Sequence, residues 1–265
     1  MKLYKNNKAG VLISILGIIT GLWILFTLAD VYNPIITGKI AGGRPDEANT
    51  VKIVFALLGW LGVTAGALWV TVLYGFMNKE NWAWFWGAVA ATLQLLASFF
   101  PMIPAASINM PTPTLWIFIA AFVLWFGMLF IGGVSKKIIA LAFISGLAYV
   151  LTFIDGVGAI SRYQTEPDGF VNGMYAMSQM VNWWGAAAWA VFIFALIKRS
   201  KKAIPLGILA TTMSMFGGYP VGLTDVLSVK KGGFSMFLVA PVVSTLLLLY
   251  LLLPSTKRMI EGDEN

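Results

Sequence analysis

Two aspartates stand in nearly the same local sequence, 125 positions apart. "TGLWILFTLAD" covers residues 20–30, and "SGLAYVLTFID" covers residues 145–155. A carboxylate inside an apolar segment costs a few kcal/mol, so it normally faces protein, a partner charge or a water-filled cavity. If Asp30 and Asp155 approach each other, their repulsion favours a shared proton, a bound cation or an arginine between them. The pattern therefore predicts a binding site for a cation, a proton or a cationic ligand group.

Other polar side chains lie where they can extend this site. Arg162 follows Asp155 by about two helical turns and lies on nearly the same helix face. Gln179 and Asn182 are three residues apart and share a face, whereas Gln94 lies in the middle of another apolar segment. The predicted site faces outward, and its ligand-binding residues are Asp30, Asp155, Arg162, Gln94, Gln179, Asn182 and Asp225. The alternative is that the acids are interfacial and the amides only hydrogen-bond neighbouring helices.

Several kinds of chemistry are excluded by composition. The chain has no cysteine and no histidine, so it lacks disulfides and the usual ligands of haem, copper and catalytic zinc. It contains no P-loop, no HExxH and no GxSxG motif. We therefore predict no metal, no cofactor and no catalytic residue, and we do not favour an enzyme.

The elements that must position these residues are membrane-spanning helices. The 265-residue chain is 59% hydrophobic and only 11% charged, with a mean hydropathy of +0.83, whereas soluble domains carry about a quarter charged residues. Runs of about 20 apolar residues cross a bilayer as helices. The sequence predicts an all-α integral membrane protein with eight such helices, over 10–30, 51–77, 82–100, 114–134, 138–160, 173–197, 203–219 and 233–253.

The segments that link these helices alternate in charge, and the alternation predicts the orientation. One side carries twelve basic residues: Lys2, Lys5, Lys8, Lys79, Lys136, Lys137, Lys198, Arg199, Lys201, Lys202, Lys257 and Arg258. The other carries six: Lys39, Arg44, Lys52, Arg162, Lys230 and Lys231. Basic residues accumulate in cytoplasmic loops, so the first side, with both termini, is predicted to be cytoplasmic. The excess of basic over acidic residues is thus explained by membrane topology, and we expect no nucleic-acid partner.

The two halves of the chain resemble each other beyond the two aspartates. "GWLG" at 59–62 corresponds to "NWWG" at 182–185, and "FP" at 100–101 corresponds to "YP" at 219–220. The offset falls from 125 to 119 along the chain, as small deletions in loops would produce. We predict two four-helix repeats, 1–134 and 135–265, in one integrated membrane domain. Each would start and end inside, so the repeats are parallel and related by a pseudo-two-fold axis along the membrane normal.

These features predict a multi-pass carrier or binding protein for a small or amphipathic molecule. Two alternatives remain open: a non-catalytic membrane subunit of a larger complex, and a lipid-modifying enzyme that uses Asp155 as its base. The expected partners are membrane lipids, a small-molecule or cation ligand, and further membrane subunits. The proline-rich, charge-free segment "PMIPAASINMPTP" at 101–113 is expected on the outer surface, either as a lid over the site or as a loop resting on the headgroups.

Overall fold

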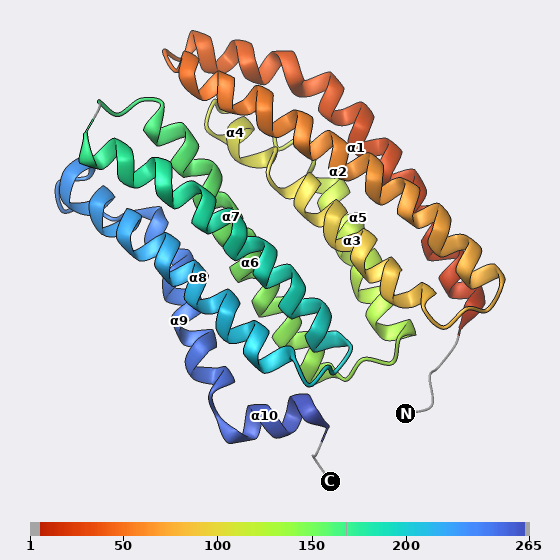
Figure 1. Ribbon diagram of the computed structural model, residues 1–265. Coiled ribbons are helices and arrows are strands. Elements are labelled where there is room, and N and C mark those ends of the chain that lie inside the picture. Colours follow the sequence, from red (N-terminus) through yellow and green to blue (C-terminus); the bar gives the residue numbers. More distant parts are fainter. Residues whose placement is uncertain (1–5, 168, 263–265) are drawn as a thin grey trace. The chain divides into compact units, whose positions relative to one another are not determined.

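The protein is built entirely from helices in the part of the chain that the structure describes. This computed structural model describes residues 6–167 and 169–262, and these residues contain no β-strand (Figure 1). The chain divides into two compact units, Met1–Val134 and Ser135–Asn265. The two units share the same kind of internal connectivity, in which four long helices follow one another and the fourth returns to the first.

The first unit contains four long helices and one short one. These are α1 (Asn7–Ala41), α2 (Pro45–Met77), α3 (Ala83–Phe99), α4 (Met102–Ala106) and α5 (Leu115–Ile131). α1 packs on α2, α2 on α3 and α3 on α5, while α5 also contacts α1. Gly21 lies at the closest approach of α1 to α2, because a Cβ on Gly21 would be 2.7 Å from the Cα of Gly66. Small residues at such crossings let the backbones of membrane helices approach closely.

The second unit repeats this order of contacts. Its helices are α6 (Lys136–Tyr163), α7 (Phe170–Ile197), α8 (Ala203–Thr224), α9 (Val239–Leu251) and α10 (Pro254–Glu261). A π-helical turn, η1 (Asp225–Val229), extends α8, and a 3₁₀ turn, η2 (Met236–Leu238), precedes α9. α6 packs on α7, α7 on α8 and α8 on α9, and α9 returns to α6. Here α10 turns away at 79° from the segment that ends α9.

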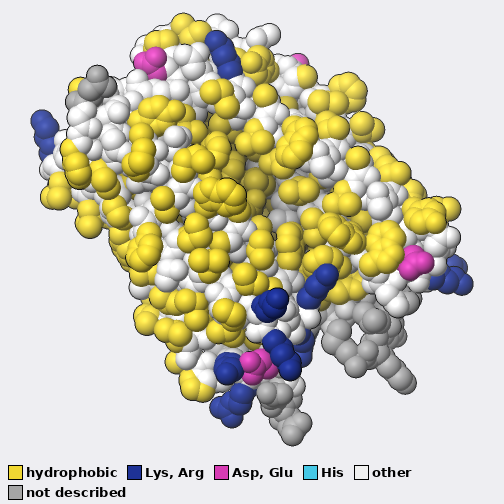
Figure 2. Space-filling view, viewed as in Figure 1, with side chains coloured by type: hydrophobic (Ala, Val, Ile, Leu, Met, Phe, Trp, Pro, Cys, Tyr) yellow, Lys and Arg dark blue, Asp and Glu magenta, His cyan; other side chains and the backbone are white. Residues whose placement is uncertain are grey.

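The long helices are apolar on the outside as well as the inside, which indicates a multi-pass membrane protein. Six helices in the described residues are long and apolar enough to cross a bilayer, or seven if α9 and the bent α10 form one span. Large apolar side chains such as Phe26, Trp60 and Trp116 are exposed, and hydrophobic side chains cover the helix sides in Figure 2. Soluble proteins rarely expose apolar area on this scale. α5 has 17 residues and falls just short of the usual length, so the count of eight spans stays a prediction.

The structure corrects the expectation that the first helix ends at Asp30. α1 continues for eleven further residues to Ala41 and passes through Pro34. The helix persists because Val31, Ile35 and Ile36 continue the buried face of α1, and because neighbouring helices commonly compensate for proline in membrane helices. The turn comes at Gly42 and Gly43, where Gly43 has a φ of +73° that glycine adopts without strain.

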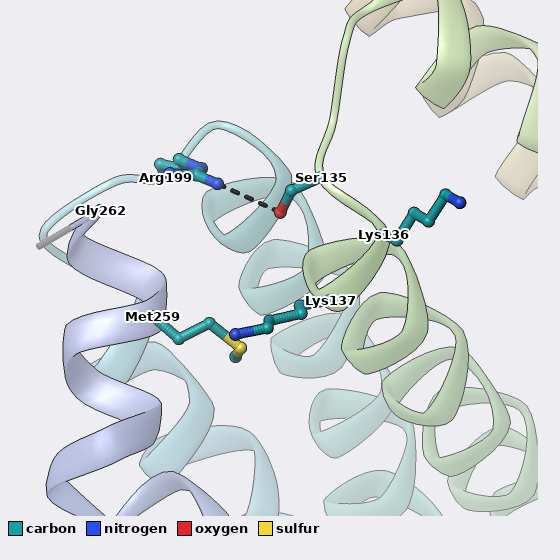
Figure 3. Close-up of a pocket in the computed structure, with 6 residues that line it drawn as sticks. All are labelled: Ser135, Lys136, Lys137, Arg199, Met259 and Gly262. Carbon is teal, nitrogen blue, oxygen red and sulfur yellow. Dashed lines mark hydrogen bonds between the residues drawn. The ribbon is translucent and has the colours of Figure 1, made fainter. Parts of the chain in front are cut away.

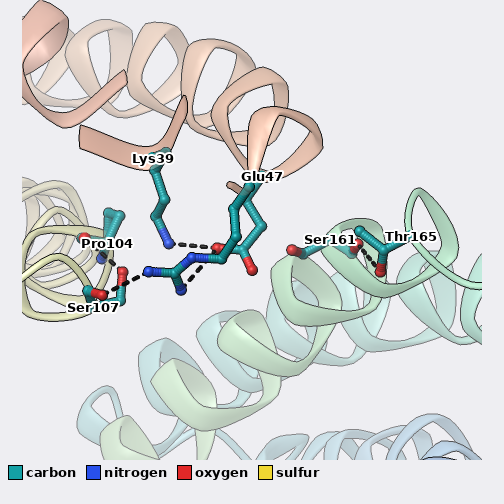
Figure 4. Close-up of polar contacts among 7 residues, drawn as sticks. Lys39, Glu47, Pro104, Ser107, Ser161 and Thr165 are labelled. Carbon is teal, nitrogen blue, oxygen red and sulfur yellow. Dashed lines mark hydrogen bonds and ion pairs between the residues drawn. The ribbon is translucent and has the colours of Figure 1, made fainter. Parts of the chain in front are cut away.

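Polar contacts fix the end of the first unit where this turn lies. Lys39, which is buried, donates a hydrogen bond to the carboxylate of Glu47, and Arg44 Nη1 lies 3.5 Å from the same carboxylate (Figure 4). Arg44 also donates from Nη2 to the carbonyl of Ser107, at 2.8 Å. Ser107 belongs to the proline-rich segment predicted as a lid or a surface loop. That segment includes the short helix α4 and is tied to the α1–α2 turn.

Candidate functional site

The interior of the second unit contains a ladder of polar side chains between α6, α7, α8 and α9. Its first level is a group of three buried hydroxyls. Thr152 Oγ1 lies 2.8 Å from Ser214 Oγ, and Ser244 Oγ lies 2.8 Å from the same Ser214 atom. Each hydroxyl comes from a different helix, α6, α8 or α9. Hydrogen bonds of this kind join helices where no water is present to compete.

The second level contains an acid and an amide that lack protein partners. Asp155 on α6 is 5% exposed, and Asn182 on α7 is fully buried. Among the described residues, neither Asp155 Oδ2 nor either polar atom of the Asn182 side chain has a hydrogen-bond partner. Nearly all buried polar groups in native proteins are hydrogen-bonded, and the exceptions commonly mark functional positions.

Glycines explain how these two side chains come to lie on contacting helix segments. A Cβ on Gly156, next to Asp155, would lie 2.1 Å from Trp183 Cδ1, which is next to Asn182. A Cβ on Gly217 of α8 would lie 2.4 Å from Asn182 Oδ1. Only glycine leaves room at either position. Asp155 and Asn182 therefore lie at the same level of the helix bundle, with α8 closing against the amide.

The third level is apolar, and the fourth is an ion pair at the end of the ladder. Ala159, Tyr175, Val221 and Phe237 form a buried apolar cluster. Beyond it, Tyr175 donates a hydrogen bond from its hydroxyl to Asp225 Oδ1 at 2.6 Å. Arg162 Nε lies 4.0 Å from that same oxygen. Asp225 begins the π-helical turn, and such turns occur frequently at functional sites.

The predicted site residues lie in both units, and most of them lie in the second. In the second unit, Arg162 approaches the carboxylate of Asp225, while Asp155 and Asn182 lie deeper in the same bundle. Gln179 is half-buried, and its backbone carbonyl lies against Gly156. In the first unit, the Gln94 side chain accepts a hydrogen bond from Trp69 Nε1 and donates one to the carbonyl of Gly17. Gln94 thus hydrogen-bonds α2 and α1, and its role in ligand binding stays a prediction.

Asp30 differs from its counterpart in environment. Asp30 is exposed on α1, whereas Asp155 is buried. Pro34 lies four residues after Asp30 and has no N–H, so the Asp30 carbonyl lacks its usual helical donor. Asp30 and Asp155 belong to different units, and their pairing stays a prediction.

One residue of the ladder was missing from the set selected from the sequence. Tyr175, which bonds Asp225, is fully buried. Its spacing to Ser178 and Asn182 is three and seven residues, which places all three on one helix face, and all three are buried. The heptad-like spacing of these polar residues in an apolar helix is the signal that identifies Tyr175.

The ladder offers hydrogen-bonding and charged groups but no metal centre. The described residues contain no group of three or more acidic, histidine or cysteine side chains able to hold a metal ion. A buried carboxylate can accept hydrogen bonds from an ammonium or hydroxyl group, or bind a proton, and an unpartnered amide offers a further donor and acceptor in the same bundle. Comparisons with protein-family models, with curated proteins and with solved structures found no match to this chain.

Proposed function

We propose that the protein is a multi-pass membrane carrier or binding protein that holds a small cationic or amphipathic ligand inside its second unit. Asp155 supplies the negative charge, and Asn182 supplies a donor and an acceptor beside it. The observation that carries the proposal is the burial of both side chains on contacting helix segments without protein partners. A carboxylate is retained in hydrocarbon surroundings only at a cost, and such residues normally serve binding or transport.

Arg162 and Asp225 complete the proposed route to the site. They lie at the end of the ladder that faces the α6–α7 and α8–α9 connections, and Arg162 is about one third exposed while Asp225 is buried. A cationic ligand that replaces Arg162 beside Asp225 would reach the apolar layer and then Asp155. The charge alternation of the linking segments supports an outward-facing position for this end and a cytoplasmic position for both termini.

Equivalent packing in the two units supports the proposed parallel repeats. In α3, a Cβ on Gly87 would meet the side chains of Met128 and Trp69. In α8, a Cβ on Gly207 would meet the side chains of Leu251 and Phe192. Both glycines thus lie on the third long helix of their unit and face the second and fourth. The correspondence supports the proposed count of eight spans, in which α5 and the segment that contains α9 would both cross the membrane.

The test is thermal stability of the purified protein across pH and a panel of cations and cationic amphiphiles. We expect a ligand or protonation to raise the unfolding midpoint of the wild type and Asp155→Asn to lose that response. Asp30→Asn is the matched control, because it removes the same charge from an exposed position. Loss of the response in both variants would indicate a site shared by the two aspartates.

A chain that responds to nothing in this panel would overturn the proposal and favour the non-catalytic subunit, whose acids would pair with a partner chain. The lipid-modifying enzyme is the weaker alternative, because it requires an acid in a cavity open to lipid. The residues that line the large apolar groove of the second unit include no acid.

A further inference from the structure

A basic cavity lies at the beginning of α6. Its volume is about 260 Å³, and its walls are Ser135, Lys136, Lys137, Arg199, Met259 and Gly262 (Figure 3). The residues come from three places in the second unit: the start of α6, the turn after α7, and α10. The cavity therefore depends on the fold of this unit and not on one stretch of sequence.

Two cations and a hydroxyl form the polar part of this cavity. Arg199 donates from Nη2 to Ser135 Oγ at 3.1 Å, and Figure 3 shows Lys137 reaching toward Met259 while Lys136 points away. Ser135 precedes the first residue of α6 but its side chain does not cap the helix. The start of α6 therefore adds its partial positive charge to those of Lys137 and Arg199.

An apolar groove adjoins the basic cavity. The groove has a volume of about 800 Å³ and runs between residues 137–151 of α6 and residues 243–250 of α9, with Ser255, Thr256 and Met259 of α10 at one end. Ligand sites typically occupy about 300–1,000 Å³. Its α6 wall of fourteen residue steps is about 21 Å long at about 1.5 Å per residue, somewhat more than half of the ~30 Å hydrocarbon core.

The cavity and the groove are neighbours, because Lys137 and Met259 line both. Lys137 therefore lies between the basic cavity and the apolar groove. Thr256 also lines the groove; it is 2% exposed, and its Oγ1 has no hydrogen-bond partner among the described side chains and backbone.

The first unit is packed differently at the comparable pair of helices. A Cβ on Gly127 of α5 would lie 2.7 Å from Ile13 Cδ1 of α1, so the Ile13 side chain fills the space against α5 there. In the second unit the groove lies between the helices in the same chain positions, α6 and α9, and α10 lies at its end.

We propose that the second unit binds one anionic phospholipid, with its phosphate at Lys137 and Arg199 and an acyl chain in the groove. Charge complementarity selects this occupant: the cavity is lined by cations, and the adjoining groove is apolar. The neighbouring Lys201 and Lys202 are exposed and lie outside the residues that line the cavity and groove. This site is independent of the one proposed at Asp155.

The first experiment compares two double variants by native mass spectrometry after exchange into phosphatidylglycerol or phosphatidylcholine. Lys137→Gln with Arg199→Gln removes the proposed phosphate ligands, and Lys201→Gln with Lys202→Gln removes the same charge nearby. Each basic residue near a membrane contributes about 1 kcal/mol to anionic-lipid binding, so we expect about 30-fold weaker retention of phosphatidylglycerol in the first variant. The second variant should retain the lipid.

A second pair of variants tests the groove without changing charge. Ala140→Trp places a large ring in the groove, whereas Ala187→Trp places one on an exposed position of α7 outside it. Loss of the bound lipid only in Ala140→Trp supports the proposal. Equal retention of phosphatidylcholine and phosphatidylglycerol by the wild type, or equal lipid loss in both double variants, would overturn it in favour of general annular lipid. Displacement of the lipid by inorganic phosphate would also overturn the proposal, because the cations would then bind phosphate without help from the groove.

Discussion

At the scale of single residues, the second unit contrasts a satisfied acid with an unsatisfied one. Asp225 accepts a hydrogen bond from Tyr175 and faces Arg162, whereas Asp155 Oδ2 has no partner in the described chain. A buried carboxylate oxygen without a partner costs stability, whereas the bond from Tyr175 offsets part of the cost of burying Asp225. These two roles are separable by substitution.

We expect Tyr175→Phe to lower the free energy of unfolding by about 1.5–3 kcal/mol, which is typical for hydrogen bonds to a charged group. The change removes one hydroxyl, leaves the ring in the apolar cluster and leaves Asp225 buried without its donor. Tyr74→Phe, on an exposed tyrosine, is the control and should change the midpoint little. Equal midpoints for the two variants in detergent unfolding would show that the Tyr175–Asp225 bond contributes nothing.

At the scale of helices, glycine decides how closely each pair packs. Gly21 and Gly146 occupy matching positions of the two halves of the sequence. Yet a Cβ on Gly21 would meet the backbone of α2, while no described atom outside its own helical neighbourhood lies within 4 Å of a Cβ on Gly146. The same residue is therefore required for packing in one unit and dispensable in the other.

This difference predicts opposite effects of one substitution. Gly21→Ala should destabilise the protein by about 1–3 kcal/mol because backbone cannot move aside as a side chain can. Gly146→Ala should stabilise it by about 0.5–1 kcal/mol, since alanine restricts the unfolded chain and favours a helix. Both are measured from unfolding midpoints of the purified variants, and effects of the same sign would contradict the packing described for α1 and α2.

The helices were largely predictable from the sequence, and the details of the site were less so. Apolar runs place each long helix, but they do not say that α1 passes Asp30, because that depends on the packing of Val31 and Ile35 against a neighbour. Gln94 is predicted as a ligand-binding residue, and its bond to Trp69, which joins residues 25 positions apart, is a contact that the sequence pattern does not show. The burial of Asp155 and Asn182 likewise depends on glycines of facing helices, which composition and periodicity do not show.

At the scale of the whole molecule, the number of spans and their direction are open to a direct test. The chain has no cysteine, so single cysteines can be labelled without background. We expect Ala41→Cys and Thr112→Cys to react with an impermeant maleimide in intact cells. Lys136→Cys and Lys201→Cys should react only after permeabilisation, because their segments are expected to face the cytoplasm.

The two cysteine variants that flank α5, Thr112→Cys and Lys136→Cys, decide the number of membrane spans. Labelling of Thr112→Cys and Lys136→Cys from the same side would show that α5 does not cross, and the eight-span arrangement with its parallel repeats would fall. Labelling after detergent denaturation is the control that every cysteine is present and reactive. The relationship between the two halves otherwise stays a prediction.

The length of α1 has a practical consequence. Its 35 residues extend about 52 Å at about 1.5 Å per residue, well beyond a ~30 Å hydrocarbon core. α2 accompanies the end of α1, and contacts of Lys39 and Arg44 with Glu47 join the two helix ends. Gly43, in the turn between the two helices, faces open space. A small globular tag inserted at Gly43 would be held by α1 on one side and α2 on the other. It would give imaging methods an alignment mark held by two helices.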